Sequence, residues 1–368
     1  MIRRYLFGYD EFQCIANQCP DTCCGPWEIE IDEESLSMYK NLSKGKDTLA
    51  FMIGEKVDFV EKSFKHHENG NCAFLEESGL CILQKEKGVE YLCNTCDQYP
   101  RHIEEFPGVR EYSVSVSCPI ASSNLLKRKA SLGYKELTDR EEEEVYEDFD
   151  SELYDFLVEM RALLLEVITN RTLSFDERAL RILTALSYAQ DEVDFSTSYK
   201  DILRNIKEIL GKNSNDSIYD EKKGYICESA FRILYDLEPL SEEFLKEKKK
   251  VEKFLFSDGI DLLVHKHQDF KEKYPQYEIW CENIAYYFLF SYMCGAVYDD
   301  YVFAEAAQAI YNTYMIVLLC MGAERENGSG GESDFSKILY QYSRELENCN
   351  ENIIMLLQKL DERRNNQE

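Results

Sequence analysis

The amino-acid sequence predicts a mainly α-helical protein in two parts. A small, irregular α+β domain rich in cysteine, about residues 1–130, is followed by an all-helical domain, about residues 131–368. Two observations predict this division. Nine of the 14 cysteines lie in the first 118 residues, and long amphipathic patterns occupy the chain after about residue 130. A chain of 368 residues is long enough for each part to bury a core, so disulfide bonds are not needed for folding.

Short elements are expected in the first part. Residues 27–32 alternate apolar and acidic side chains, which is the period-two pattern of a half-buried strand. Residues 33–65 are predicted to be helical. Residues 71–83 are predicted to form a hairpin around a Glu-Ser-Gly turn, followed by a helical turn over 84–92. Residues 112–118 alternate Tyr, Val and Cys with Ser, which predicts a strand with its serines on one face and Cys118 turned inward.

Amphipathic patterns predict long helices in the second part. They cover residues 153–167, 176–189, 199–210, 225–235, 241–256, 280–297, 301–321 and 334–363. Two stretches within them, 284–297 and 306–323, contain no charged residue. The first is too short to cross about 30 Å of hydrocarbon, and the second is interrupted by polar residues. Both are therefore expected to be buried core helices.

Charge excludes some classes of partner. The chain has 42 basic and 70 acidic residues, a net charge of −28, and acidic residues exceed basic ones in both parts. Such a surface repels a nucleic-acid backbone or an anionic membrane, so neither is an expected partner. The first 14 residues contain no apolar run of signal-peptide length, which predicts a cytoplasmic protein with reduced thiols.

The spacing of the N-terminal cysteines favours metal binding. The pattern runs C-x4-C-x3-C-C, then C-x8-C, C-x2-C and a final single cysteine. Thiolates two to four residues apart can converge on one soft metal ion or cluster. The alternative is a disulfide framework, which a cytoplasmic chain of this size does not need. The other five cysteines stand singly in apolar helical surroundings, where we expect core packing: Cys227, Cys281, Cys294, Cys320 and Cys349.

The spacing of the cysteines does not decide whether the metal is zinc or an iron–sulfur cluster. Zinc fingers pair two close knuckles, and this chain has one, Cys93 and Cys96. The C-x3-C-x2-C triplet of radical enzymes that use S-adenosylmethionine is missing, because Pro26 stands where its third cysteine would be. Adjacent Cys23 and Cys24 are expected to point in different directions, so that they serve two sites or one of them packs.

The cysteine-rich segment resembles the flagellin lysine-N-methylase family, within a wider group of zinc- or iron-chelating proteins. The matching motifs, which cover about the first 120 residues, are Phe12-x-Cys14-x4-Cys19-x-Asp21-Thr22-Cys23-Cys24-x2-Trp27, Cys72-x-Phe74-Leu75, Gly79-Leu80-Cys81, Thr95-Cys96-x2-Tyr99-Pro100-Arg101 and Ser117-Cys118-Pro119. The helical remainder fits the family in length and character without a motif to compare.

This resemblance implies a protein-lysine N-methyltransferase that uses S-adenosylmethionine, holds a 4Fe–4S type cluster and acts on flagellin. The metal ligands it implies are Cys14, Cys19, Cys23, Cys24, Cys72, Cys81, Cys96 and Cys118. Cys93 lies outside the family pattern. Eight thiolates exceed the four of one cluster, so either two metal sites exist or some of these cysteines are structural. Catalytic and cofactor-binding residues, and the oligomeric state, are not identified by any motif.

The chemistry of methyl transfer sets two conditions on such an enzyme, and the cysteines also allow two other functions. Methyl transfer from a sulfonium requires an unprotonated amine in line with the methyl carbon. No strand, Gly-rich turn and helix of a Rossmann-like cofactor site occurs, so the cofactor is expected elsewhere, near the metal. The alternatives are a non-catalytic module tied together by zinc or iron, and a thiol redox or metal-handling protein.

Overall fold

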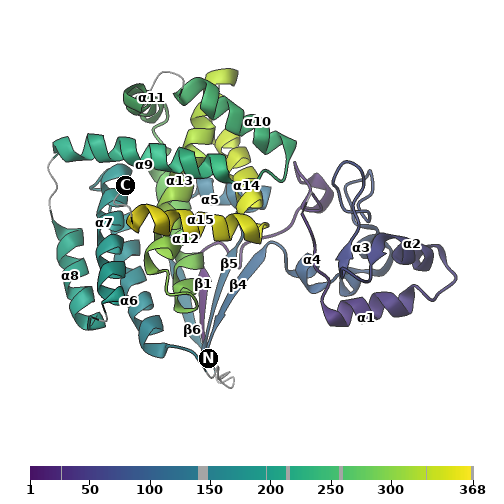
Figure 1. The fold of residues 1–368 in the computed structure, drawn as a ribbon. Coiled ribbons are helices and arrows are strands. Elements are labelled where there is room, and N and C mark those ends of the chain that lie inside the picture. Colours follow the sequence, from purple (N-terminus) through teal and green to yellow (C-terminus); the bar gives the residue numbers. More distant parts are fainter. Residues whose placement is uncertain are drawn as a thin grey trace.

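The computed structural model describes residues 1–25, 27–139, 148–195, 197–212, 216–256, 260–328 and 330–365. Figure 1 shows two lobes: a large body of helices around a small sheet, and a smaller lobe that contains α1 to α4. We call residues 27–98 the small lobe, and the sheet with α5 to α15 the body. The described residues form 15 α-helices and six short strands, which confirms the mainly α-helical prediction.

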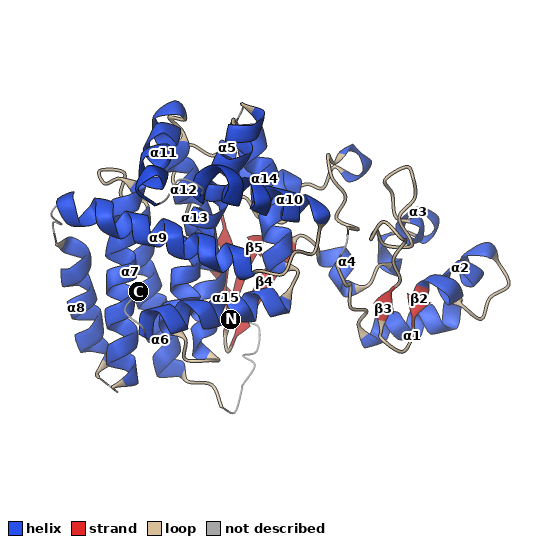
Figure 2. Cartoon of the chain, turned by 45° about the horizontal axis from the view of Figure 1, so that its top comes forward, coloured by secondary structure: helices blue, strands red, loops and turns tan. Residues whose placement is uncertain are grey.

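The body contains a four-stranded sheet in the order β4-β5-β1-β6. Its strands are β1 (Ile2–Leu6), β4 (Arg101–Phe106), β5 (Val109–Val114) and β6 (Tyr134–Thr138). β1 runs parallel to β5, with Ile2 opposite Val109, and antiparallel to β6. The small lobe is thus an insertion between β1 and β4, and Figure 2 shows the strands of the sheet at the side of the body nearest this lobe.

The strand expected over residues 112–118 is only partly correct. β5 ends at Val114, and the predicted serine face is not exposed, because Ser113 and Ser117 are both buried. The reason is that a helix packs on this face: the Ser291 hydroxyl donates to Ser113 Oγ at 3.1 Å. A sheet covered on this face does not follow the simple alternation of a half-exposed sheet. Cys118 is buried, as expected.

The small lobe has its own hydrophobic core. Its elements are α1 (Glu33–Leu42), α2 (Thr48–Lys56), β2 (Val57–Asp58), β3 (Ser63–Phe64), α3 (Ile82–Lys87) and α4 (Asn94–Gln98). The helical prediction for residues 33–65 therefore holds only to Lys56. The predicted strand over 27–32 keeps its alternation, with Ile29 and Ile31 buried, but pairs only through one bridge from Glu30 to Ser63.

The predicted hairpin over residues 71–83 is reduced to a turn. Leu75 and Cys81 form a single bridge, and Gly79 closes the turn with φ +79, a conformation that glycine adopts without strain. The chain then enters α3 at Ile82, so the predicted second strand is missing. The two predicted strands of this hairpin do not form a ladder, because several of their backbone groups bond to the cysteine-bearing loops instead. For example, the Cys72 N–H donates to the Cys24 carbonyl, and the Leu75 N–H donates to the Cys72 carbonyl.

The helices of the body agree closely with the amphipathic patterns. They are α5 (Pro119–Lys127), α6 (Ser151–Ile168), α7 (Phe175–Asp194), α8 (Tyr199–Gly211), α9 (Asp216–Asp236), α10 (Glu242–Val251), α11 (Ile260–Lys273), α12 (Tyr277–Tyr292), α13 (Val302–Asn327), α14 (Glu332–Glu347) and α15 (Asn350–Asn365). Three details were not predicted. α5 and α11 were missed, and the single helix expected over 334–363 is two helices, α14 and α15.

The apolar stretches at 284–297 and 306–323 are buried core segments, as expected. By length and composition one described helix, Val302–Glu326, could cross a membrane, but its apolar window is entirely buried inside the protein. The five isolated cysteines are also all buried.

The predicted division at residue 130 stays a prediction. The packing adds a separate observation: strands β1, β4 and β5 contribute Leu6, Phe106 and Val109 to the core of the body, whereas residues 29–96 form the core of the small lobe.

Candidate metal centre

The first cysteine segment, residues 14–24, is a loop fixed by hydrogen bonds to its own backbone. The Trp27 indole donates to the Cys23 carbonyl at 2.9 Å, and the Cys24 N–H donates to Thr22 Oγ1 at 3.1 Å. The Cys24 carbonyl in turn accepts from the Cys72 N–H at 3.0 Å. These contacts hold Cys24 beside Cys72, although the two are far apart in sequence.

Asp32 fixes the Cys93–Cys96 knuckle against the lobe. One carboxylate oxygen accepts from the Ser35 N–H and caps α1, and the other accepts from the Asn94 N–H at 2.9 Å at the start of α4. These donors hold the pKa of Asp32 below its ordinary value despite burial, which raises it. Cys93 is the residue before α4, and Cys96 lies one turn into it.

Five thiols lie in or against the core of the small lobe, and we call them the inner group: Cys24, Cys72, Cys81, Cys93 and Cys96. Their charges act on one another. The charges of Cys72 and Cys81 act to raise the pKa of Cys24, and those of Cys24 and Cys72 act to raise the pKa of Cys96. Burial raises the pKa of Cys72 to about 11. A hydrogen bond from the Cys96 thiol lowers the pKa of Cys93, and one from Cys23 lowers that of Cys24.

Three further thiols are close enough for their charges to act on one another, and we call them the outer group: Cys14, Cys19 and Cys118. Burial raises the pKa of Cys118 to about 11, and Cys19 and Cys23 add to this shift. Cys23 therefore acts on the outer group, and it also hydrogen-bonds Cys24 of the inner group. The expectation that Cys23 and Cys24 serve different sites is not tested by these contacts, but Cys23 links the two groups.

Arg344 of α14 connects the cysteine loop to the body. Its guanidinium donates to Asp21 Oδ2 at 2.9 Å and to the Ser117 carbonyl at 3.1 Å. The positive charge of Arg344 also opposes the upward shifts in the pKa of Cys19 and Cys23. A fixed cation thus lies beside thiols that would carry negative charge as metal ligands.

The thiols suit a soft metal because they are free and because several of them lie in one core. All 14 cysteines are free, so no disulfide framework is present. As the side chains stand, no three His, Cys, Asp or Glu residues of the described chain converge closely enough to hold a metal ion. The chemistry of the donor set nevertheless suits zinc or an iron–sulfur cluster, because each is held by four thiolates and the inner group alone supplies five.

All eight cysteines of the predicted ligand set lie in the inner group, the outer group or at Cys23 between them. The structure adds Cys93, which the family pattern omits but which hydrogen-bonds Cys96. Its C-x2-C spacing was the signal that could have included it.

A cavity of about 350 Å³ lies beside the outer group. Its walls include the aromatic residues Phe7, Tyr9, Phe12 and Tyr287, and Phe12 also packs against Cys118. This volume is within the usual range for small-molecule sites, about 300–1,000 Å³. No sequence pattern predicts this cavity, because Tyr287 comes from α12 and the other three aromatic residues come from the segment after β1.

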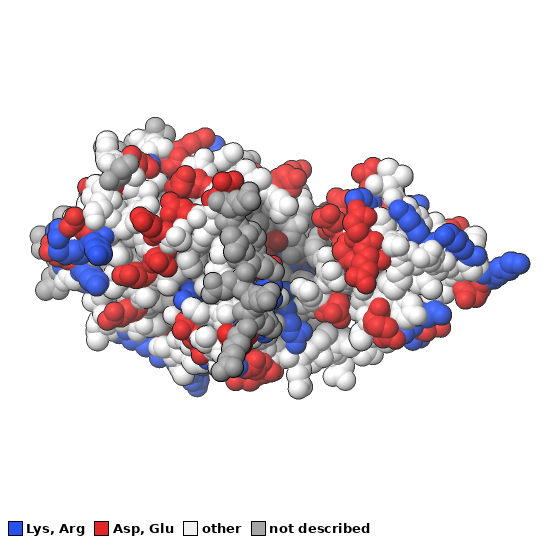
Figure 3. All heavy atoms as spheres, turned by 90° about the horizontal axis from the view of Figure 1, so that it is seen from below, with Lys and Arg blue, Asp and Glu red and all other residues white. Residues whose placement is uncertain are grey.

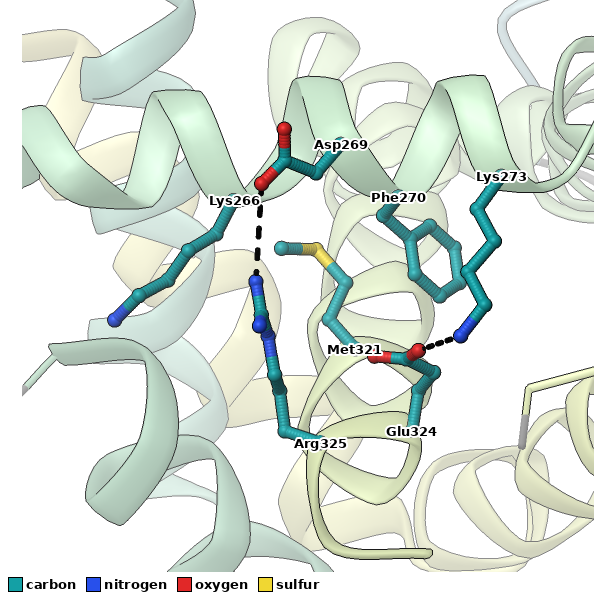
Figure 4. A pocket seen from close by; sticks show the side chains of 7 residues that line it. All are labelled: Lys266, Asp269, Phe270, Lys273, Met321, Glu324 and Arg325. Atoms are coloured by element: carbon teal, nitrogen blue, oxygen red, sulfur yellow. Dashed lines mark hydrogen bonds and ion pairs between the residues drawn. The ribbon is translucent and has the colours of Figure 1, made fainter. Parts of the chain in front are cut away.

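A second cavity, of about 240 Å³, lies between α11 and α13 (Figure 4). Figure 4 shows two ion pairs on its rim, Lys273 with Glu324 and Arg325 with Asp269. These charges neutralise one another, and no candidate thiol is among the lining residues. This cavity is therefore a weaker candidate than the one beside Cys118.

The surface is acidic over both lobes. On the face drawn in Figure 3, acidic side chains are spread over the body and the small lobe, as the composition predicts.

The fold and site define a mainly helical protein with a thiol-rich lobe joined to a helical body. Residues 161–368, more than half of the chain, match the FliB lysine N-methylase C-terminal domain. The chain belongs to the FliB lysine N-methylase family, as the resemblance of its cysteine motifs indicated.

Individual relatives share a shorter stretch. A Lysine-N-methylase of Salmonella typhimurium is 28% identical over 134 residues, 34% of this chain and 33% of that protein. The Flagellar biosynthetic protein FliU of Salmonella muenchen is 29% identical over 122 residues, 31% of this chain and 71% of that protein. The match thus spans about one third of the length of the curated lysine-N-methylase. No solved structure matches.

Proposed function

We propose that this protein is a protein-lysine N-methyltransferase that uses S-adenosylmethionine and acts on flagellin. The observation that carries the proposal is the family match over the helical body, residues 161–368. The names of its relatives, Lysine-N-methylase and Flagellar biosynthetic protein FliU, support a flagellar protein substrate. An acidic surface favours the approach of a lysine-bearing substrate. A cytoplasmic location is part of the same proposal.

The metal part of the proposal rests on the grouped thiols. Cys24, Cys72, Cys81 and Cys96 of the inner group would hold the first metal, with Cys93 as a neighbouring donor, after their sulfurs turn toward one centre. Cys14, Cys19, Cys23 and Cys118 supply four further thiols for a second site. An iron–sulfur cluster supplies a redox-active iron centre when bound, whereas zinc supplies folding energy.

The chain itself must bind, orient and deprotonate the amine that receives the methyl group. A lysine ammonium has no lone pair for attack, so the pocket has to favour the neutral amine and exclude water. The cavity beside Cys118 has the aromatic lining that such a pocket needs, and it lies next to the proposed metal ligands.

The test is methyl transfer by protein purified without oxygen. With S-adenosylmethionine and flagellin, mass spectrometry should find methyl-lysine, and the protein should be brown and contain iron and sulfide. Cys24→Ser should bleach it, whereas the matched control Cys320→Ser, a buried cysteine of α13, should keep its colour. Protein that retains its metal but gives no methyl-lysine would contradict the proposal.

A second candidate is a non-catalytic module in which zinc ties the loops of the small lobe together. It is favoured by the position of the inner group in a core separate from that of the body. It predicts colourless protein with stoichiometric zinc that loses the fold of the small lobe on chelation. The hydrogen-bonded Cys93 and Cys96 also permit a redox role, which a constant free-thiol count after mild oxidation would exclude.

A further inference from the structure

Glu347, the last residue of α14, has an unusual environment for a carboxyl group. It is half-buried, and its oxygens accept hydrogen bonds from the hydroxyls of Ser115 and Tyr287. Desolvation raises its pKa to about 7, although these hydroxyls and the charge of His102 act in the opposite direction. Figure 1 places α14 on the side of the body that faces the small lobe.

Two other carboxylates of the core are held very differently. Glu111 pairs with the guanidinium groups of Arg4 and Arg161, and Glu282 pairs with those of Arg171 and Arg178. Each of these carboxylates thus has two guanidinium partners, and for Glu111 they hold its pKa below the ordinary value although burial raises it. Glu347 is bonded by neutral hydroxyls instead, so it can exchange a proton near neutral pH without breaking an ion pair with arginine.

Tyr287 connects Glu347 to the cavity beside Cys118. Tyr287 is one of the lining residues of that cavity, and its hydroxyl lies 3.2 and 3.3 Å from the two Glu347 oxygens. The charged residues in the lining of the cavity are Lys127, Arg128 and Glu11, so two cations stand against one carboxylate. Apolar walls and this excess of positive charge both disfavour an ammonium ion and favour a neutral amine.

We infer that this cavity receives the side chain of the lysine to be methylated, and that Glu347 takes up the lysine proton through Tyr287. An N–H bond of the ammonium breaks and its proton moves to the Tyr287 oxygen, while the hydroxyl proton of Tyr287 moves to a Glu347 oxygen. The freed lone pair then forms a bond to the methyl carbon of the sulfonium donor, and the electrons of the broken C–S bond remain on sulfur. Glu347 is thus a positioning residue that acts through Tyr287. The inference rests on the proposed function for the identity of the reaction.

The groups around Glu347 set the pH range of the test. His102 of β4 faces it and is itself paired with Glu104, whose Oε1 lies 2.8 Å from His102 Nε2. α12 contributes Tyr287 and Tyr292, and α14 contributes Tyr342, all with pKa values raised well above 10 by burial. The tyrosines therefore stay neutral near pH 7, whereas the contact with Glu104 raises the pKa of His102 although burial lowers it.

The test uses n-butylamine, which has the chemistry of a lysine side chain, and measures its binding to the full-length protein by calorimetry. Because the bound amine gives its proton to ionised Glu347, affinity for the wild-type protein should rise about tenfold between about pH 6 and about pH 8. Glu347→Gln and Tyr287→Phe should bind more weakly over this range. Because the amine must then lose its proton to solvent, their affinity should keep rising about tenfold per pH unit instead of levelling off above about pH 7. Far-UV circular dichroism confirms that each variant is folded.

Glu345→Gln is the matched control. Glu345 is a buried carboxyl on the same helix with a raised pKa, but it bonds Ser241 at the start of α10 and does not line the cavity. It should bind butylamine as the wild type does. Equal binding and equal pH dependence in the wild type, Glu347→Gln and Tyr287→Phe would overturn the inference. If butylamine binds as expected but flagellin is not methylated, the proposed function is wrong and the amine site stands.

Discussion

Replacing Glu111 by glutamine removes the negative charge that holds two guanidinium groups in the core of the body. Glu111 is 2% exposed on β5 and accepts from Arg4 of β1 at 2.9 Å and from Arg161 of α6 at 2.5 Å. Arg161 is also 2% exposed, and its other bond goes to the Phe290 carbonyl of α12 at 2.7 Å. This carboxylate therefore joins the sheet to two helices.

The expected cost follows from the cations left behind. Breaking a buried ion pair by removing one partner costs about 3–5 kcal/mol, because an uncompensated charge remains in the core. Arg4 keeps a second partner, Glu136, at 2.9 Å, whereas Arg161 keeps the neutral carbonyl and the ring of Phe290. We therefore expect Glu111→Gln to lose about 3 kcal/mol, the lower end of the range.

Urea unfolding followed by far-UV circular dichroism measures this loss. The control is Glu105→Gln on the neighbouring strand, which removes a surface pair with Arg110 and should cost less than about 1 kcal/mol. The double variant Glu111→Gln with Arg161→Met should be more stable than Glu111→Gln alone, since it removes the unpaired charge. Equal stability of the Glu111 and Glu105 variants would refute the reasoning.

Three further perturbations test other parts of the structure. The pKa of Glu347 is raised from 4.5 to about 7, so the folded protein binds this proton more tightly than the unfolded chain does. The free energy of unfolding should therefore fall as pH rises from about 4.5 to about 7. Thermal melts of the wild type and Glu347→Gln over this range should show a smaller fall in the variant. Gly322→Ala in α13 should destabilise the protein, because the added Cβ would lie 3.0 Å from the Val251 backbone nitrogen. Gly211→Ala is the control, since the space around Gly211 is open. The midpoint of urea unfolding should fall in the first variant and not in the second. Chelation should expose residues 27–98 to protease while the helical dichroism of the body persists, because the two cores are separate; simultaneous loss of both would contradict this.

Periodicity predicted the helices of the body because each of them buries one apolar stripe. The prediction for α6 was within two residues of the observed ends. The same signal could not show the break after α14, since Leu346, Ile353 and Leu357 continue the three- and four-residue spacing across it. It also missed α11, whose charged composition hides its apolar positions Leu263 and Phe270.

The sheet could not be predicted, because its pairings join distant segments. β1 pairs with β5 from Ile2 to Val109 and with β6 from Ile2 to Thr138. No local pattern specifies such a partner. Tertiary packing also decided that Ser113 faces a helix rather than solvent.

For the candidate site, the sequence identified the cysteines, and the structure showed how they are grouped. Spacing linked Cys93 to Cys96 correctly, but it could not bring Cys24 to Cys72, which meet through a backbone hydrogen bond. Glu347 and Tyr287 were missed because an acidic or aromatic residue on an amphipathic helix carries no signal of its own. The family match falls on the helical body, where no motif had been found.

The insertion of the small lobe between β1 and β4 sets an order of assembly during translation. Residues 27–98 leave the ribosome and can bury their own core while β1 still has no partner strand. Tyr287 and Glu347 are synthesised close to the end, so the cavity beside Cys118 closes last. Under the proposed function, a nascent chain would therefore bind its metal before the C-terminal helices dock and complete that cavity.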